Sequence, residues 1–255
     1  MLNFEKPTYK ITEYVENNNY GKFELEPLER GFGTTIGNAL RRVMLSSMPG
    51  SAIVAVKIDG IMHEFQTIEG IVEDVTAIIL NLKNIVIKNH TDEIITLHLS
   101  AFDEGVVTAG DISENSDVEI INKDQVIATL SKGAKLEMDL IIANGRGYEP
   151  SSENKKYIEN ESVGYIPIDA LYSPIERISF EVDNARVGQD ASYDKLIMDV
   201  YTNGSIRPEE AMALSSKILI EHLNIITNLS EIADMTGIMN AKQEDSKLKK
   251  LERPI

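Results

Sequence analysis

Residues 25–50, LEPLERGFGTTIGNALRRVMLSSMPG, decide the fold of this chain. Three glycines early in the stretch let the backbone turn, because glycine tolerates positive φ angles at little cost. Thr34 or Thr35 then offers a side-chain cap for a helix over residues 34–47. A Pro–Gly pair closes the stretch and ends the helix.

The predicted helix carries an apolar stripe with two arginines beside it. Ile36, Leu40 and Val43 recur at helical spacing, whereas Arg41 and Arg42 lie near the middle of the helix. Two charged guanidinium groups next to a surface that favours burial indicate a docking face for another protein. Taken alone, this segment is better explained as an ordinary amphipathic helix with a solvated arginine pair.

The glycines allow a rival interpretation. Gly31, Gly33 and Gly37 follow a possible strand and open a helix, and the apolar segment 51–58 ends at Asp59. That order is typical of dinucleotide-binding units, which would make the chain an NAD(P)-dependent oxidoreductase. The preceding strand, YGKFELEP, argues against this, because it alternates charged and apolar residues as half-exposed antiparallel strands do.

The composition is that of an ordinary globular protein with one or two domains: 255 residues, 42% hydrophobic and 26% charged. The formal net charge of −16 argues against direct binding to nucleic-acid phosphates. Without cysteine, the chain has no disulfide, thiolate metal ligand or cysteine nucleophile. The four histidines lack metal-ligand spacing, and His98 is expected to face solvent from a strand. No apolar run predicts a membrane span or signal peptide, so a cytoplasmic location is expected.

The two ends of the chain differ from its middle. Residues 9–15 and 20–28 read as a hairpin, and the section 50–164 reads as strands with one wet face. One helix interrupts that section at residues 75–82, where apolar residues follow helical spacing. The polar segment 143–164 is predicted to be a long exposed loop.

The last predicted element is a long helix that Pro208 opens, with two acidic residues in its first turn. It carries two apolar stripes. One comprises Ala211, Leu214, Ile218, Ile225, Leu229 and Ile232, and the other comprises Met212, Leu219, Leu223 and Ile226. Two stripes predict a helix buried on more than one side, which a partner subunit or a single large core would provide. The partner is the favoured explanation.

Several long motifs in consecutive order carry a family resemblance. They are PLERGFGTTIGNALRRVMLSSMPG, IDGIMHEFQTIEGIVEDV, LNLKN, GRGYEP, YSPIERISFEVDNARVGQ, DKLIMDV and TNGSIRPEEAMALSSKILIEH. From about residue 4 to residue 235, the chain resembles the amino-terminal part of the α subunit of bacterial DNA-directed RNA polymerase.

The resemblance implies a two-part α+β fold. A dimerisation domain of antiparallel strands and two helices would form from residues 1–48 and 165–235, with a strand-rich domain, residues 49–164, inserted between them. Residues 236–255 would begin a flexible linker. Nothing after Pro254 resembles the family's small DNA-binding domain, so DNA binding is not expected of this chain.

The resemblance also implies partners. The chain would form a homodimer and scaffold the β and β′ subunits of the polymerase. The implied dimer contacts are Ile36, Leu40, Val43, Leu214, Ile218, Leu219, Leu223, Ile225, Ile226 and Leu229. The implied β contacts are Arg42, Leu45, His63 and Glu64, and the implied β′ contacts are Lys83, Ser173 and Arg177. A dimeric adaptor unrelated to transcription would share the two-striped helix and stays an alternative.

No catalytic group is expected in this chain. Phosphodiester synthesis needs carboxylates that hold two metal ions, and the sequence contains no clustered triplet of aspartates. Asp190, Asp194 and Asp199 are separated by lysine and apolar residues and read as ordinary solvated or turn carboxylates. We therefore expect no catalytic residue, bound metal or cofactor.

Overall fold

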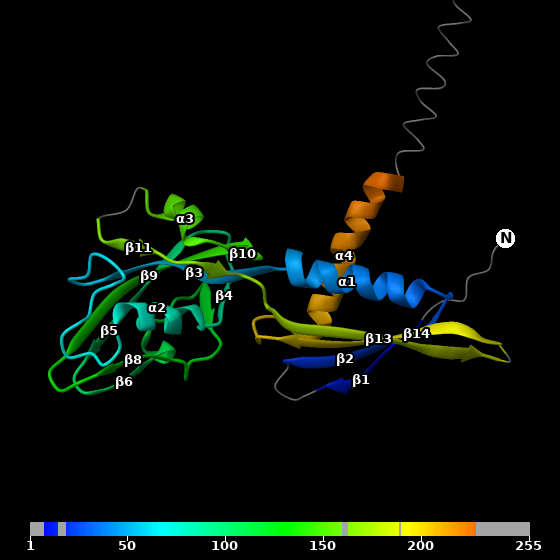
Figure 1. Cartoon of the computed structure of the whole chain (residues 1–255), viewed down its shortest axis with the longest axis horizontal. Coiled ribbons are helices and arrows are strands. Elements are labelled where there is room, and N and C mark those ends of the chain that lie inside the picture. Colours follow the sequence, from blue (N-terminus) through cyan, green and yellow to red (C-terminus); the bar gives the residue numbers. More distant parts are fainter. Residues whose placement is uncertain (1–7, 15–18, 160–162, 189, 228–255) are drawn as a thin grey trace, which may run out of the picture.

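The computed structural model describes residues 8–14, 19–159, 163–188 and 190–227 (Figure 1). The fold is α+β, as predicted, with almost entirely antiparallel strands. Two sheets lie side by side: a four-stranded sheet built from both chain ends, and a six-stranded sheet built from the middle of the chain. Two helices cover one face of the four-stranded sheet.

The four-stranded sheet has the order β1-β2-β14-β13, with every neighbouring pair antiparallel. Its strands are β1 (Thr8–Tyr14), β2 (Tyr20–Leu28), β13 (Ile175–Val187) and β14 (Asp190–Thr202). The predicted hairpin is confirmed, although Val15 and most of its asparagine turn lie outside the described residues. Because β2 pairs only with antiparallel strands, the strand before the glycines is not part of a parallel dinucleotide-binding unit.

The two covering helices are α1 (Phe32–Ser47) and α4 (Pro208–Thr227). They share one apolar core with the sheet, in which Leu40, Met44, Met198 and Ala211 are buried. The helix of residues 34–47 thus begins two residues earlier than predicted. Its N-cap is Gly31, in a left-handed conformation with φ 88°, and neither threonine caps it.

The six-stranded sheet has the order β5-β9-β3-β4-β7, with β11 paired to β3. Its strands are β3 (Pro49–Ile58), β4 (Ile87–Asn89), β5 (Ile95–Phe102), β7 (Val118–Ile120), β9 (Lys135–Arg146) and β11 (Tyr165–Pro167). Two small ladders flank it: β6 (Gly105–Thr108) with β8 (Val126–Leu130), and β10 (Tyr148–Glu149) with β12 (Ala170–Leu171). A short 3₁₀ turn, Ala109–Asp111, follows β6.

Helix α2 (Val75–Lys83) packs against the six-stranded sheet. Its predicted apolar spacing is confirmed, because Val75, Ile78 and Leu82 have no exposed surface. The side chain of Asp74 caps the helix by accepting a hydrogen bond from the Ala77 amide at 2.7 Å.

The prediction of a long exposed loop over residues 143–164 is wrong. Strand β9 continues to Arg146, and β10, the short helix α3 (Ser151–Asn154) and the 3₁₀ turn Lys155–Tyr157 follow. Asn154 is fully buried and donates a hydrogen bond to the Ile168 carbonyl at 2.6 Å. The segment has too few apolar residues to show a periodic pattern, so local sequence could not reveal that it folds back onto the sheet.

Candidate interaction surface

Helix α1 lies close to the four-stranded sheet because two of its glycines present no side chain there. A Cβ atom at Gly33 would lie 2.8 Å from Cγ1 of Val182, and one at Gly37 would lie 2.6 Å from Cδ2 of Phe180. These separations are shorter than van der Waals contact allows. The glycines therefore set the spacing between helix and sheet.

The amino-terminal end of α1 holds an anion that belongs to the chain itself. The Asp194 carboxylate, on β14, accepts hydrogen bonds from the Gly31 amide at 2.8 Å and the Gly33 amide at 3.2 Å. Helix N-termini stabilise negative charge through free N–H groups and the helix dipole. Asp194 occupies the position that a nucleotide phosphate would need in the rival interpretation.

The prediction that the three aspartates are ordinary solvated or turn carboxylates is wrong for Asp194 and Asp199. Asp194 caps α1, and Asp199 accepts a hydrogen bond from the Tyr20 hydroxyl at 2.8 Å. The side chain of Asp190 lies outside the described part of the structure. Among the described residues, no group of three or more His, Asp or Glu side chains is placed to hold a metal ion.

The outer face of α1 presents charge and one apolar side chain. Arg41 and Arg42 are exposed, and 41% of Leu45 is exposed. Ile36 is only partly buried, whereas Leu40 is 6% exposed and packs in this chain's own core. A partner would therefore gain little buried area from Leu40.

Helix α4 leaves a cluster of apolar side chains uncovered at its carboxy-terminal end. Leu214 and Leu219 pack partly against the core, and Ile218 is half-buried. The cluster itself consists of Ile220, Leu223, Ile225 and Ile226, which are 57%, 56%, 70% and 60% exposed. Figure 1 shows this end of α4 rising away from the sheet and past α1. Ile220 was not among the predicted contacts, and Leu229 lies outside the described residues.

The four predicted β contacts lie at two separate places. Arg42 and Leu45 are on α1, whereas His63 and Glu64 lie in the loop after β3. Strand β3 separates the two pairs, and ten extended residues span roughly 33 Å. The loop also exposes Phe65 (81%), whose ring centroid lies 6.4 Å from that of His63, and Met62 (64%). The motif IMHEF contains both apolar residues, so the sequence offered a signal for them.

Each predicted β′ contact has a partner within the chain. Lys83, in the last turn of α2, pairs with Asp169 at 2.9 Å. The Ser173 hydroxyl accepts a hydrogen bond from the Ile175 amide at 3.4 Å, and the Arg177 guanidinium lies 4.0 Å from the Tyr201 ring centroid. Ser173 therefore lies in the segment that joins β11 to β13, and Lys83 is held to the same segment through Asp169.

Acid stability should depend on the Lys83–Asp169 pair. The hydrogen bond from Lys83, followed by that from the Ser151 amide, holds the pKa of Asp169 below its ordinary value of 3.8. A depressed carboxyl pKa contributes stability above the unfolded-state pKa, and this contribution is lost as pH falls through the folded-state pKa. The pair is about one-third exposed, so its contribution is less than about 1 kcal/mol.

We expect Asp169→Asn to lower the melting temperature near neutral pH, with the difference from wild type shrinking as the pH falls through the lowered folded-state pKa of Asp169. Thermal melts recorded across this range measure it. Asp59→Asn serves as control, because the exposed Asp59 has no ion pair among the described residues. An undiminished difference at the acid end would contradict this role of Asp169.

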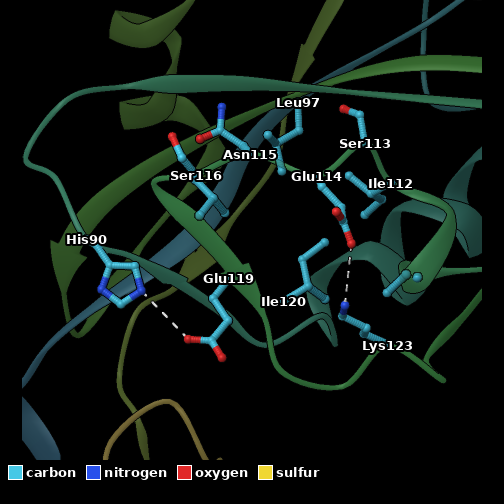
Figure 2. A pocket seen from close by; sticks show the side chains of 13 residues that line it. His90, Leu97, Ile112, Ser113, Glu114, Asn115, Ser116, Glu119, Ile120 and Lys123 are labelled. Atoms are coloured by element: carbon cyan, nitrogen blue, oxygen red, sulfur yellow. Dashed lines mark ion pairs between the residues drawn. The ribbon is translucent and has the colours of Figure 1, made fainter.

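A cavity of about 340 Å³ lies at the edge of the six-stranded sheet (Figure 2). Its polar side chains pair with each other: His90 Nε2 lies 3.7 Å from Glu119, and Lys123 lies 4.0 Å from Glu114. Each of these two carboxylates thus already has a partner, and the described residues converge on no single ligand chemistry there.

Comparisons with known proteins agree with this architecture. Residues 56–173 match the family model described as the RNA polymerase Rpb3/RpoA insert domain. A DNA-directed RNA polymerase subunit alpha from Oceanobacillus iheyensis is 51% identical over 255 residues, which is 100% of this chain and 81% of that protein. Identity at that level over the whole chain shows common family membership. The chain belongs to the alpha-subunit family of DNA-directed RNA polymerase.

Proposed function

We propose that this chain homodimerises and scaffolds the assembly of the polymerase β and β′ subunits. The observation that carries the proposal is the apolar cluster on α4, whose four large side chains are each more than half exposed. Exposed apolar surface of this kind marks protein interaction sites. A second copy of the same helix would cover it in a symmetric, self-complementary contact.

The proposed division of labour follows the two sheets. Residues 1–48 and 165–235 form the dimerisation domain, and residues 49–164 form an inserted domain. Separate apolar cores under the two sheets support two units, but β11 pairs with β3 and Ile166 and Ile168 pack in the core of the six-stranded sheet, so we place the second boundary between β12 and β13 rather than at residue 165. One protomer then contacts β through Arg42, Leu45, His63 and Glu64, while the other contacts β′ through Lys83, Ser173 and Arg177.

The chain contributes no catalytic group in this proposal. Asp194 and Asp199, which would be candidates for metal ligands, hold hydrogen bonds inside the four-stranded sheet and at the start of α1. The polymerase activity belongs to the assembled complex, and the expected location is the cytoplasm. In the described part of the chain, no helix has the length and apolar character needed to cross a membrane.

Arg42 tests the proposed β contact. Arg42→Ala should weaken recruitment of the β subunit by roughly 2–5 kcal/mol, because the carboxylate or carbonyl groups that meet the guanidinium would be left unpaired. A pull-down with a titration of purified β measures this loss. Arg41→Ala is the matched control, since Arg41 is the neighbouring exposed arginine on the same helix. Wild-type affinity of the Arg42→Ala variant would refute the assignment.

A further inference from the structure

The chain passes at two places between the part built on the four-stranded sheet and the part built on the six-stranded sheet. Met48 joins α1 to β3, and residues 172–174 join β12 to β13. The two passages run side by side, because a Cβ atom at Gly50 would overlap the backbone carbonyl oxygen of Tyr172. Short connections of this kind act as hinges, since a few residues absorb a large change in φ and ψ. The angle between the two parts therefore depends on contacts outside the passages.

One contact of this kind joins Ile121 to Gly204. Gly204 lies in the turn from β14 into α4, whereas Ile121 directly follows β7 in the other part. Figure 1 shows the turn into α4 at the end of the four-stranded sheet nearest to the six-stranded sheet. A Cβ atom at Gly204 would lie 3.2 Å from Cγ2 of Ile121. The isoleucine methyl group therefore packs against the glycine across the boundary between the two parts.

Hydrogen bonds hold the turn that carries this glycine. The side-chain oxygen of Asn203 accepts from the amide and the hydroxyl of Ser205 at 3.0 and 2.7 Å. The Asn203 amide donates to the Pro174 carbonyl at 3.0 Å. Gly204 itself has a φ angle of 93°, which glycine adopts at little cost. Because asparagine side chains stabilise turns through such bonds, Gly204 is presented in one fixed position.

Ile121 is held as firmly on its own side of the boundary. Its amide donates a hydrogen bond to the Val86 carbonyl at 3.0 Å. The next residue, Asn122, accepts from the Val86 amide at 2.8 Å and donates to the Asn84 carbonyl at 2.9 Å. Asn84 is the C-cap of α2, so these bonds tie Ile121 to the helix that packs on the six-stranded sheet. Two well-supported surfaces therefore meet at this contact.

Opposite charges face each other across a cavity between the two parts. The cavity, of about 320 Å³, is lined by Lys88 and Asn144 of the six-stranded sheet and by Ser205 and Glu210 at the start of α4. The pKa of Glu210 lies below its ordinary value, chiefly because Arg207 donates hydrogen bonds to the carboxylate and further because Lys88 contributes positive charge. Glu210 is exposed, so salt screens the attraction between Lys88 and Glu210.

We propose that the contact between Ile121 and Gly204 fixes the angle between the two parts of this chain. Packing of the methyl group on the turn sets the angle, and the attraction between Lys88 and Glu210 opposes opening of the cavity. A fixed angle would keep the two proposed groups of β contacts at one separation. That consequence rests on the proposed function, whereas the contact itself does not.

The distance between the two sheets tests the proposal directly. The chain contains no cysteine, so Thr96→Cys and Ser179→Cys place one spin label on each sheet at exposed strand positions. Doubly labelled chain diluted into excess unlabelled chain keeps the measured distance within one protomer. Pulsed electron resonance then reports the distribution of distances.

The labelled chain with native Ile121 should give one narrow distribution. Ile121→Ala should give a broader, shifted one, because the packing across the boundary is lost. Ile120→Ala is the matched control: Ile120 packs against the core of the six-stranded sheet, so the distribution should stay narrow. A broad distribution with native Ile121, or an unchanged one in Ile121→Ala, would overturn the proposal.

Lys88→Glu decides the case if Ile121→Ala does not fold. It places two negative charges across the cavity, so the distribution should widen at low salt and narrow again at high salt, where ions screen the repulsion. Lys132→Glu makes the same charge change before β9, at the opposite end of that strand from Asn144, and should have no effect. An unchanged low-salt distribution in Lys88→Glu would then overturn the proposal. Recruitment of β is a separate readout, so a failed contact is distinguishable from a failed scaffold.

Discussion

Leu223→Glu is expected to convert the proposed homodimer into a monomer at micromolar concentration. Leu223 is 56% exposed in the protomer and lies within the apolar cluster on α4. Burying such a side chain contributes roughly 1.5–3 kcal/mol, and a symmetric dimer loses it twice. The total of roughly 3–6 kcal/mol raises the dissociation constant about 10²- to 10⁴-fold.

Sedimentation velocity over a concentration series measures this shift. Ala213→Glu introduces the same charge at an exposed position of α4 that belongs to neither apolar stripe, so this control should remain dimeric. A Leu223→Glu variant with the dissociation constant of wild type would place the dimer contact elsewhere.

Gly50→Ala should cause the largest loss of stability among single glycine substitutions. The new Cβ would overlap the backbone carbonyl oxygen of Tyr172, which no change of side-chain rotamer can move. Overpacking of this kind costs about 3 kcal/mol, because the start of β3 and the segment that follows β12 must separate. For a chain of this size that corresponds to a melting temperature roughly 6–12 °C lower.

Gly105→Ala is the matched control. A Cβ atom at Gly105 would meet no atom within 4 Å, so the expected change in melting temperature is close to zero. Equal melting temperatures for Gly50→Ala and Gly105→Ala would show that Gly50 and Tyr172 are not packed as described.

Local patterns predicted much of the fold. The alternation in residues 20–28 predicted β2, and the spacing of Val75, Ile78 and Leu82 predicted the buried face of α2. Both features repeat within a few residues, so they are visible in a short window of sequence. Pro208 and the acidic residues after it likewise marked the start of α4.

Interactions between distant parts of the chain could not be predicted in this way. The cap of α1 comes from Asp194, which is 163 positions from Gly31 in the sequence. A prediction from neighbouring residues alone therefore gives the cap to Thr34 or Thr35, which lie within the helix itself. The same limit applies to Leu40: its position on an apolar stripe indicates burial, but only the fold shows that the chain's own core covers it.

The Asp194 carboxylate also explains why the glycine stretch resembles a nucleotide-binding loop. Gly31 and Gly33 do present amides to an anion at a helix N-terminus, but the anion is part of the protein. Family membership likewise leaves no support for an adaptor unrelated to transcription.

Light scattering of the purified chain, alone and then mixed with the polymerase β subunit, tests the central claim most directly. The account predicts a particle with the mass of two chains at micromolar concentration, and a larger complex once β is added. A folded monomer that leaves β unbound would contradict it.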